Sequence, residues 1–399
     1  MFSNKLKRVT AILLAILILV VAGVTGIFLG YNYVTSQERR FDALDLDIAS
    51  GALVINRDTP DAVMLVIESG DDTEDIAEKL EDAGLIGNSL VFRLMSKFNG
   101  FDGGYLSGTH FLTKGLSYDE IMYLLCQEPE VIKITFPEGM TYLEIKKKLI
   151  ESGLEFDPEK LDECMNSQNL FVGYDFVSQI AINEDRDYIL SGYLFPDTYY
   201  FDMNASEVEI IDTFLRNTKL KLSQYEDLYA RAEKIGMSMD QVLTLASVIQ
   251  QEAKRSDMRT VSCVFHNRLN AEDPSMQKLE SCATINYLRQ IDGLDKVWSA
   301  DNPADRMRDS AYNTYLYAGL PPGPICMPGI DAITAALYPT DENYMYFCAT
   351  GIEGGSAFAV TLDEHNANVE KYRPNWTDTP AEDNAAILPE ETLEETSVE

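Results

Sequence analysis

The sequence has few positive charges for its length. It contains 32 Lys and Arg against 65 Asp and Glu, and its formal net charge at pH 7 is −33. Proteins that bind nucleic acids need clustered Lys and Arg to neutralise phosphates, so we expect no nucleic-acid partner. The excess of acid favours solubility and does not specify a fold.

The sequence also has few histidines and no closely spaced cysteine pairs. Its only histidines are His110, His266 and His365, and none of its six cysteines forms a CxxC pair. A zinc site normally requires such pairs or a histidine cluster, so we expect no metal and no cofactor. The six cysteines are Cys126, Cys164, Cys263, Cys282, Cys326 and Cys348. They could form disulfides outside a membrane, but their wide spacing favours buried thiols.

One long apolar run is present near the N-terminus. Residues 9–30 carry no charge and are rich in Ile, Leu, Val and Ala, which is enough to cross a bilayer. Lys5, Lys7 and Arg8 precede the run, and positive charge there predicts a cytoplasmic N-terminus. A cleaved signal peptide is the alternative, but the run does not end in a small-residue cleavage site. We therefore predict a cytoplasmic segment 1–8 and a transmembrane helix 9–31, with the C-terminal domain on the extracellular side of the cell membrane.

The rest of the chain predicts an α+β protein. Residues 32–60 are polar and are predicted to form a linker. Residues 61–128 are predicted to form a small α+β module, and 129–373 a larger mixed α+β domain. Within the module we expect strands at 63–67 and 104–112 and helices at 73–83, 89–98 and 118–125. Residues 374–399 are acidic, contain no Lys or Arg and are predicted to be disordered.

The stretch LASVIQQEAKR, residues 245–255, places an acid in an apolar helix. Ser238 and Gln241 fit a capping box, and the helix is predicted to run from Met239 to about Arg255. Apolar residues recur on one stripe, and Glu252 lies at its edge. They are Val242, Leu245, Ala246, Ile249 and Ala253.

Two interpretations of Glu252 follow from this position. A carboxyl group beside apolar surface loses hydration and holds its proton more tightly, which suits a general acid. Cleavage of a glycosidic bond needs such a donor for the leaving oxygen. Alternatively, Glu252 ends the apolar face and pairs with Arg255 or Lys254, and pattern alone favours this interpretation.

Six motifs, taken in order, are similar to those of one known family. They are SGYLFPDTYYF (191–201), LASVIQQEA (245–253), VFHNRL (264–269), LESCATINY (279–287), YNTYLYAGLPPGPICMPG (312–329) and YMYFCATG (344–351). Together they resemble the YceG-like endolytic murein transglycosylases, the MltG family. The resemblance extends to the membrane anchor and to residues 61–128, which look like the LysM-like subdomain of that family, and makes 129–373 its catalytic domain.

The resemblance implies a lyase of the bacterial cell wall. Members of the family cut the bond between N-acetylmuramic acid and N-acetylglucosamine inside nascent glycan strands, form a 1,6-anhydro ring and terminate strand elongation. The implied partners are peptidoglycan strands, peptidoglycan synthases and proteins of the divisome or elongasome.

The resemblance also assigns roles to individual residues. The catalytic Glu of the family corresponds to Glu252, while a second Glu that many members have two positions earlier is Gln250 here. Implied substrate-binding residues are Tyr312, Asn313, Tyr315, Glu280, Ser281 and Thr284. Cys282 and Met327 depart from polar residues common in the family, so we do not assign them substrate contacts.

Two alternative functions remain open at this stage. A muramidase-type hydrolase would use water as nucleophile and would need a second acid, for which Glu280 is the best candidate. A catalytically idle scaffold would bind glycan through residues 61–128 and recruit wall synthases.

Overall fold

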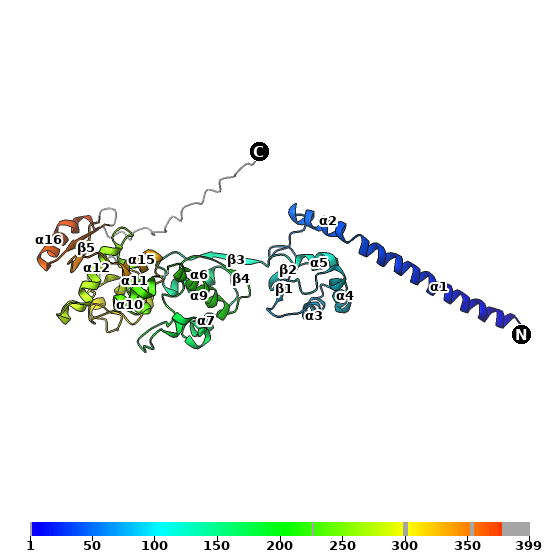
Figure 1. The fold of residues 1–399 in the computed structure, drawn as a ribbon, viewed down its shortest axis with the longest axis horizontal. Helices are drawn as coiled ribbons and strands as arrows, with labels where there is room; N and C mark the ends of the chain where they lie inside the picture. The colour runs from blue at the N-terminus through cyan, green and yellow to red at the C-terminus, as the bar shows by residue number, and fades with distance from the viewer. Residues whose placement is uncertain (1, 226, 298–301, 352–354, 377–399) are drawn as a thin grey trace, which may run out of the picture. The chain divides into compact units, whose positions relative to one another are not determined.

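The structure is a computed structural model that describes residues 2–225, 227–297, 302–351 and 355–376. The chain divides into two compact units. Unit 1 comprises Met1–Val131 and Asp202–Asn204, and unit 2 comprises Ile132–Phe201 and Ala205–Glu399. Helices and strands occur in both units, so the predicted α+β class is confirmed (Figure 1).

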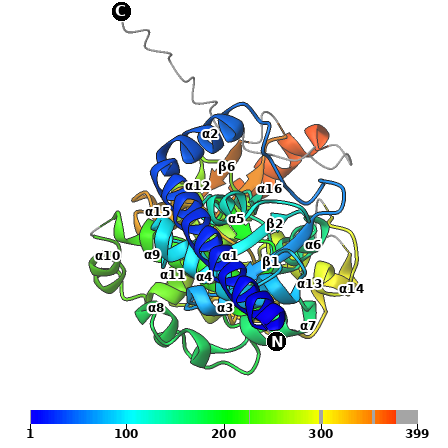
Figure 2. The ribbon, with the colours of Figure 1, turned by 90° about the vertical axis from the view of Figure 1, so that its right-hand side faces the viewer.

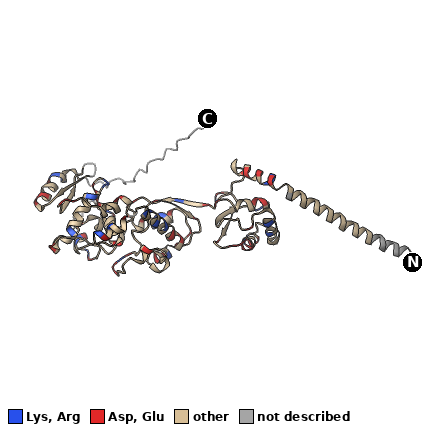
Figure 3. Ribbon diagram, viewed as in Figure 1, with Lys and Arg blue, Asp and Glu red and all other residues tan. Residues whose placement is uncertain are grey.

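Unit 1 starts with a long apolar helix. Helix α1 (Phe2–Thr35) contains the stretch Ile12–Tyr33, which is long and apolar enough to cross a membrane. Figure 2 shows α1 as one continuous helix, and Figure 3 shows its middle without acidic or basic residues. Helix α2 (Gln37–Ala49) follows and lies inside the segment predicted to be a linker. It packs Phe41 edge-on against Phe101, with 5.0 Å between the ring centroids.

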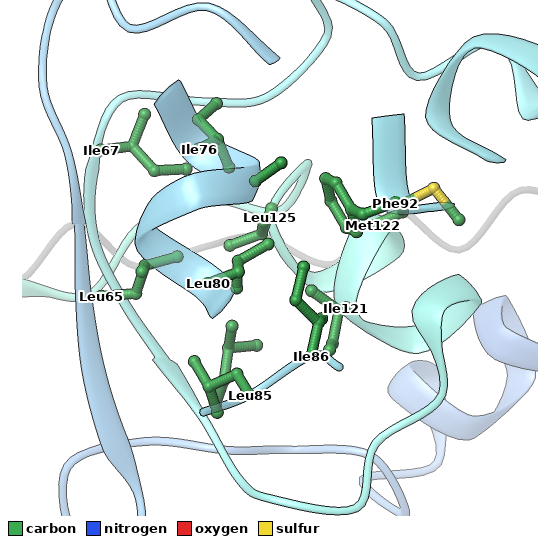
Figure 4. Packing of buried hydrophobic residues seen from close by; sticks show 12 residues of the cluster. Leu65, Ile67, Ile76, Leu80, Leu85, Ile86, Phe92, Ile121, Met122 and Leu125 are labelled. Atoms are coloured by element: carbon green, nitrogen blue, oxygen red, sulfur yellow. The ribbon is translucent and has the colours of Figure 1, made fainter. Parts of the chain in front are cut away.

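Two strands and three helices form the rest of unit 1. They are β1 (Val63–Ile67), α3 (Thr73–Asp82), α4 (Ser89–Asn99), β2 (Gly108–Leu112) and α5 (Tyr118–Leu124). Strands β1 and β2 are antiparallel, with Val63 opposite Leu112 and Ile67 opposite Gly108. Apolar side chains from all five elements meet in one core, part of which is drawn in Figure 4. This core includes Leu65, Ile76, Leu80, Phe92, Leu112 and Ile121.

The second strand of unit 1 is shorter than predicted. The sequence predicts a strand over 104–112, whereas β2 begins at Gly108. Gly104 instead belongs to a turn, in which its N–H donates to the carbonyl oxygen of Phe101 over 2.8 Å. Strand β1 has only five residues, so the ladder can pair only five residues of β2.

Unit 2 contains two small sheets and many short helices. Strands β3 (Val131–Thr135) and β4 (Thr198–Asp202) pair, as do β5 (Tyr346–Ala349) and β6 (Ser356–Ala359). The α-helices are α6 (Tyr142–Glu151), α7 (Pro158–Met165), α8 (Asp175–Ser178), α9 (Glu207–Ser223), α10 (Leu228–Lys234), α11 (Met239–Glu252), α12 (Met258–Leu269), α13 (Cys282–Ile291), α14 (Pro303–Arg306), α15 (Ile330–Leu337) and α16 (Leu362–Tyr372). Short 3-10 helices lie at Gln168–Phe171, Pro274–Gln277 and Arg373–Asn375.

Helix α11 is the most deeply buried helix near the site. The predicted capping box is present, since the N–H of Gln241 donates to Ser238 Oγ and the N–H of Ser238 to Gln241 Oε1. Every residue from Val242 to Ile249 is buried, so the helix is covered all round and not along one stripe. It packs on α15, α12 and α13.

Helix α11 ends at Glu252, three residues before the predicted end. Ala253 has extended backbone angles, with φ −131° and ψ 142°, which stop the helix. The two preceding glutamines hold this end in place. Gln251 Nε2 donates to the carbonyl oxygen of Gly139 over 2.6 Å, and the N–H of Gly329 donates to Gln250 Oε1 over 2.9 Å. A helix that continued to Arg255 would not present Glu252 at a helix terminus.

All six cysteines are present as thiols, and Cys164, Cys263, Cys326 and Cys348 are buried.

Residues 377–399 of the predicted acidic tail lie outside the described residues. The first three residues of that predicted tail are described, and Trp376 Nε1 donates to the carbonyl oxygen of Ala349 over 2.7 Å.

Candidate active site

The carboxylate of Glu252 meets the first turn of another helix. Glu252 Oε1 accepts hydrogen bonds from the hydroxyl of Ser281 and from the N–H of Ala283, the latter over 3.0 Å. Ser281 is the N-cap of α13. The first N–H groups of a helix have no partner inside the helix and carry partial positive charge, so they favour an anion. The start of α13 therefore orients the acid that ends α11.

Two opposing effects act on the proton of Glu252. Burial raises the pKa of the Glu252 carboxyl, while hydrogen bonds from Ser281 and from the N–H groups of Ala283 and Cys282 lower it. Burial is the larger effect, so the pKa lies above that of an ordinary glutamate. Such a group keeps its proton to a higher pH than an ordinary glutamate does, as a general acid requires, and its carboxylate can afterwards accept a proton.

Glu252 does not form an ion pair with Arg255, one of the two partners that the alternative interpretation named. The guanidinium of Arg255 binds Asp331, with 2.6 Å between Nε and Oδ2. The hydrogen bonds to Glu252 Oε1 come from the start of α13, 29 to 31 residues further along the chain.

Glu252 lines a groove in unit 2 with a volume of about 600 Å³. The end of α11, the start of α13, strand β5 and helix α16 all contribute to its lining. Four aromatic and three basic side chains are included: Tyr315, Tyr346, Phe347, Trp376, Arg268, Arg306 and Arg373. Aromatic rings offer flat apolar surfaces, and the arginines offer hydrogen-bond donors in a fixed plane. The groove can therefore bind a polar ligand that has apolar faces.

Three of the six predicted binding residues lie in or directly beside this groove. Ser281 touches Glu252, and Tyr315 and Glu280 are lining residues. The hydroxyl of Tyr315 lies 3.2 Å from Cys282 Sγ, and the guanidinium of Arg306 lies over the Tyr315 ring at 5.0 Å from its centroid. Burial raises the pKa of Tyr315, so the phenol stays protonated and can donate a hydrogen bond.

Glu280 has an unusual backbone conformation. Its φ is +52°, in the left-handed region that side chains other than glycine rarely adopt. The ion pair between Glu280 Oε2 and Arg268 Nη2, 2.6 Å long, and a bond from the Glu280 N–H to the carbonyl oxygen of Thr314, 3.1 Å long, hold it there. A strained conformation of this kind persists only where the surrounding structure fixes it, and it occurs often at functional sites.

The other three predicted binding residues are buried and do not line the groove. Asn313 Nδ2 donates to the carbonyl oxygens of Arg306 and Arg308 over 3.0 and 2.8 Å, and the N–H of Tyr315 donates to Asn313 Oδ1. Thr284 Oγ1 bonds to Thr314 Oγ1 over 2.9 Å. Tyr312 packs against Tyr287 in the core, with the rings tilted by 38° and 4.9 Å between their centroids. These side chains hold the loop beneath Tyr315 and the start of α13.

Sequence reasoning did not single out several lining residues. Arg268 and Tyr346 belong to quoted motifs, but nothing in the pattern distinguishes a groove residue from a core residue. Trp376 lies beyond the last motif. Of the two residues that depart from the family pattern, Cys282 lines the groove and Met327 is buried, with its sulfur 3.1 Å from the backbone nitrogen of Gly192.

The carboxyl of Glu252 lies in a groove lined by aromatic and basic residues, and its raised pKa suits it to donate and accept a proton there. Comparison with known proteins identifies the family. The chain matches the YceG-like family over residues 65–371 and belongs to it, which confirms the resemblance seen in the motifs.

Two relatives and one solved structure are informative. A protein named endolytic murein transglycosylase from Streptococcus pneumoniae D39 is 28% identical over 384 residues, 92% of this chain and 66% of that protein. This chain therefore spans just under two thirds of the length of that relative. The endolytic murein transglycosylase of Bacillus subtilis 168 is 30% identical over 326 residues, 80% of this chain and 87% of that protein. The 2.6 Å crystal structure of a YceG-like protein from Listeria monocytogenes is 28% identical with a TM-score of 0.52, and the match covers 77% of this chain and 99% of that one.

Proposed function

We propose that the chain is an endolytic murein transglycosylase that cleaves the bond between N-acetylmuramic acid and N-acetylglucosamine within nascent glycan strands. The names of its relatives support this activity. The observation that carries the proposal is the position of Glu252, whose carboxyl is held by the start of α13 and lines the groove. Termination of strand elongation would follow from such a cut.

Glu252 acts twice in the proposed mechanism. Its protonated carboxyl first donates to the leaving glycosidic oxygen. The resulting carboxylate then removes the proton from the 6-hydroxyl of the muramic acid as that oxygen attacks C1, which closes the 1,6-anhydro ring. A nucleophile within the same sugar has a large proximity advantage over water. A second catalytic carboxylate, as in glycosidases that use water, is therefore not required.

The groove supplies binding and orientation. Tyr315, Tyr346 and Trp376 offer rings on which sugar faces can stack. Ser281 and the backbone of Ala283 orient Glu252 and stabilise the carboxylate formed after proton transfer. Asn313 and Thr284 act as positioning residues, because both side chains are fully buried and bond to the loop and helix that carry Tyr315 and Ser281.

The remaining predicted features are part of the same proposal. Residues 12–33 anchor the chain in the cell membrane, and Lys5, Lys7 and Arg8 place the N-terminus in the cytoplasm. Residues 63–112 of unit 1 have the order strand, helix, helix, strand, which supports a LysM-like module that binds glycan. Wall synthases and proteins of the divisome or elongasome are the proposed protein partners.

A hydrolase is the second candidate function, because the groove holds another acid, Glu280. Product analysis distinguishes the two. Full-length protein in detergent is incubated with uncrosslinked glycan strands, and the products are examined by mass spectrometry. A transglycosylase gives 1,6-anhydro ends, whereas a hydrolase gives reducing ends that are heavier by one water molecule. If the wild-type protein cuts no glycan but retains binding to it, the chain is a scaffold and the proposal fails.

A further inference from the structure

Helix α4 of unit 1 exposes a continuous apolar face. Its large exposed side chains are Leu90 at 59%, Val91 at 44%, Leu94 at 49% and Phe98 at 72% exposure. Residues four and eight apart lie on one side of a helix, so Leu90, Leu94 and Phe98 form one stripe and Val91 widens it. Monomeric soluble proteins rarely leave such a patch uncovered.

The opposite face of α4 belongs to the core of unit 1. Phe92 and Ser96 are fully buried, and Figure 4 shows Phe92 pointing into the apolar cluster. Since another face of α4 is already buried in this core, the exposed apolar stripe does not belong to the core. Lys97 lies at the edge of the stripe, and Arg93 beside it binds Glu74 over 2.6 Å.

The end of α4 is joined to the end of the apolar stretch of α1. Asn99 Nδ2, in the last residue of α4, donates to the hydroxyl of Tyr33 over 2.8 Å. Gln37 Nε2 donates to the carbonyl oxygen of Asn99 over 2.8 Å. Tyr33 also donates to Asp119 over 2.8 Å, and Asp119 binds Arg40. Since Tyr33 is the last residue of the stretch Ile12–Tyr33, these bonds keep α4 where the anchor leaves the bilayer.

We propose that α4 lies on the outer surface of the membrane with Leu90, Val91, Leu94 and Phe98 inserted at the boundary between headgroups and acyl chains. This inference rests on the proposed membrane anchor. An amphipathic helix with aromatic and aliphatic residues on one face and a basic residue beside them is typical of such a position. Lys97 favours anionic headgroups. The tether through Tyr33 and Asn99 favours lipid as the partner, because it holds the end of α4 that carries Phe98 at the end of the proposed membrane span.

The consequence is a second attachment of unit 1 to the bilayer. The anchor alone would leave the module free to turn about the point where α1 leaves the membrane. An inserted α4 fixes the height and the tilt of unit 1. The glycan that the module meets would then be the newest material, closest to the membrane.

Quenching by lipid tests the proposal with the full-length chain. Phe98→Trp is reconstituted in vesicles of phosphatidylcholine and phosphatidylglycerol, with and without brominated acyl chains. The matched control is Ile182→Trp, an equally apolar site in unit 2 with 89% exposure. We expect bromine to quench the emission added by Phe98→Trp by at least about half, and to leave the emission added by Ile182→Trp unchanged. A second change, Leu94→Asp, should weaken lipid contact roughly tenfold, because burial of one leucine is worth at least that factor.

The outcomes separate this proposal from the anchor. Vesicle flotation of the wild-type chain reports the anchor, and failure to float overturns both. Flotation without extra quenching at position 98 overturns the insertion of α4 alone. Extra quenching that persists unchanged with Leu94→Asp also overturns it. Photocrosslinking from position 98 to a second copy of the chain, without quenching, would make the face a dimer interface and reject lipid as its partner.

Discussion

Replacement of Glu252 by glutamine separates its chemistry from its structural contacts. Glu252→Gln keeps the length of the side chain and an oxygen that can accept from Ser281 and from the N–H of Ala283. It removes the exchangeable proton that both proposed steps use. General acid–base catalysis contributes roughly 10²–10⁴-fold, so we expect release of anhydro products to fall by at least about 10²-fold.

The same substitution should not weaken the fold at neutral pH. Because the pKa of Glu252 is raised in the folded state, the folded chain holds this proton more tightly than the unfolded chain. As pH rises through the ordinary glutamate pKa, the unfolded chain loses the proton first, and the wild type loses stability until the raised pKa is passed. Glutamine does not titrate. We therefore expect Glu252→Gln to be more stable than the wild type at about pH 8 and similar to it at about pH 4.

Thermal unfolding and product analysis on the same samples test both parts. The gain in stability appears as a higher Tm of Glu252→Gln than of the wild type at about pH 8. Glu280→Gln is the matched control, since it makes the same chemical change in the same groove. We expect that control to retain anhydro product formation. Full turnover by Glu252→Gln would refute the role of Glu252. At each pH the Tm of Glu252→Gln is compared with that of the wild type. A difference that favours the variant less at about pH 8 than at about pH 4 would refute the proposed effect of burial. Loss of activity in Glu280→Gln with reducing-end products in the wild type would favour the hydrolase.

Three further substitutions test the surroundings of the site. Ser281→Ala removes a donor that lowers the pKa of Glu252, so the fall of kcat/KM at alkaline pH should move to higher pH. Loss of the helix cap should cost about 1 kcal/mol of stability. Ser281→Thr should restore both the pH profile and the stability. Asn313→Ala leaves two carbonyl oxygens and one N–H without their hydrogen-bond partner. This change should lower the free energy of unfolding by about 3 kcal/mol. An unchanged Tm would show that water replaces the amide. Gly192→Ala should cost about 3 kcal/mol, because φ is +87° and the added methyl would lie 2.4 Å from the Pro324 ring; a soluble variant with the wild-type Tm would contradict this.

Part of the fold followed directly from local sequence patterns. Strand β1, helices α3 and α4 and the start of α11 lie where hydrophobic periodicity and capping residues predict them. These signals are local, since a capping box joins residues only three positions apart. The extent of β2 and the end of α11 were predicted less well. Both depend on partners distant in sequence, namely the length of β1 and the contacts of Gln250 and Gln251.

The sequence predicted which acid, Glu252, is the catalytic candidate. It did not predict which residues surround that acid. The motif around Glu252 supplies an acid at the end of a mostly apolar helix. Packing between segments far apart in the chain decides this environment. It lets Ser281 and Ala283 donate to Glu252 and brings Trp376 to the same groove. It also directs Asn313 into the protein and away from the groove. Local patterns determine which residues are in helices and which chemistry they carry. Only the tertiary structure determines which of these residues lie near one another, because each such contact depends on the positions of several elements at once.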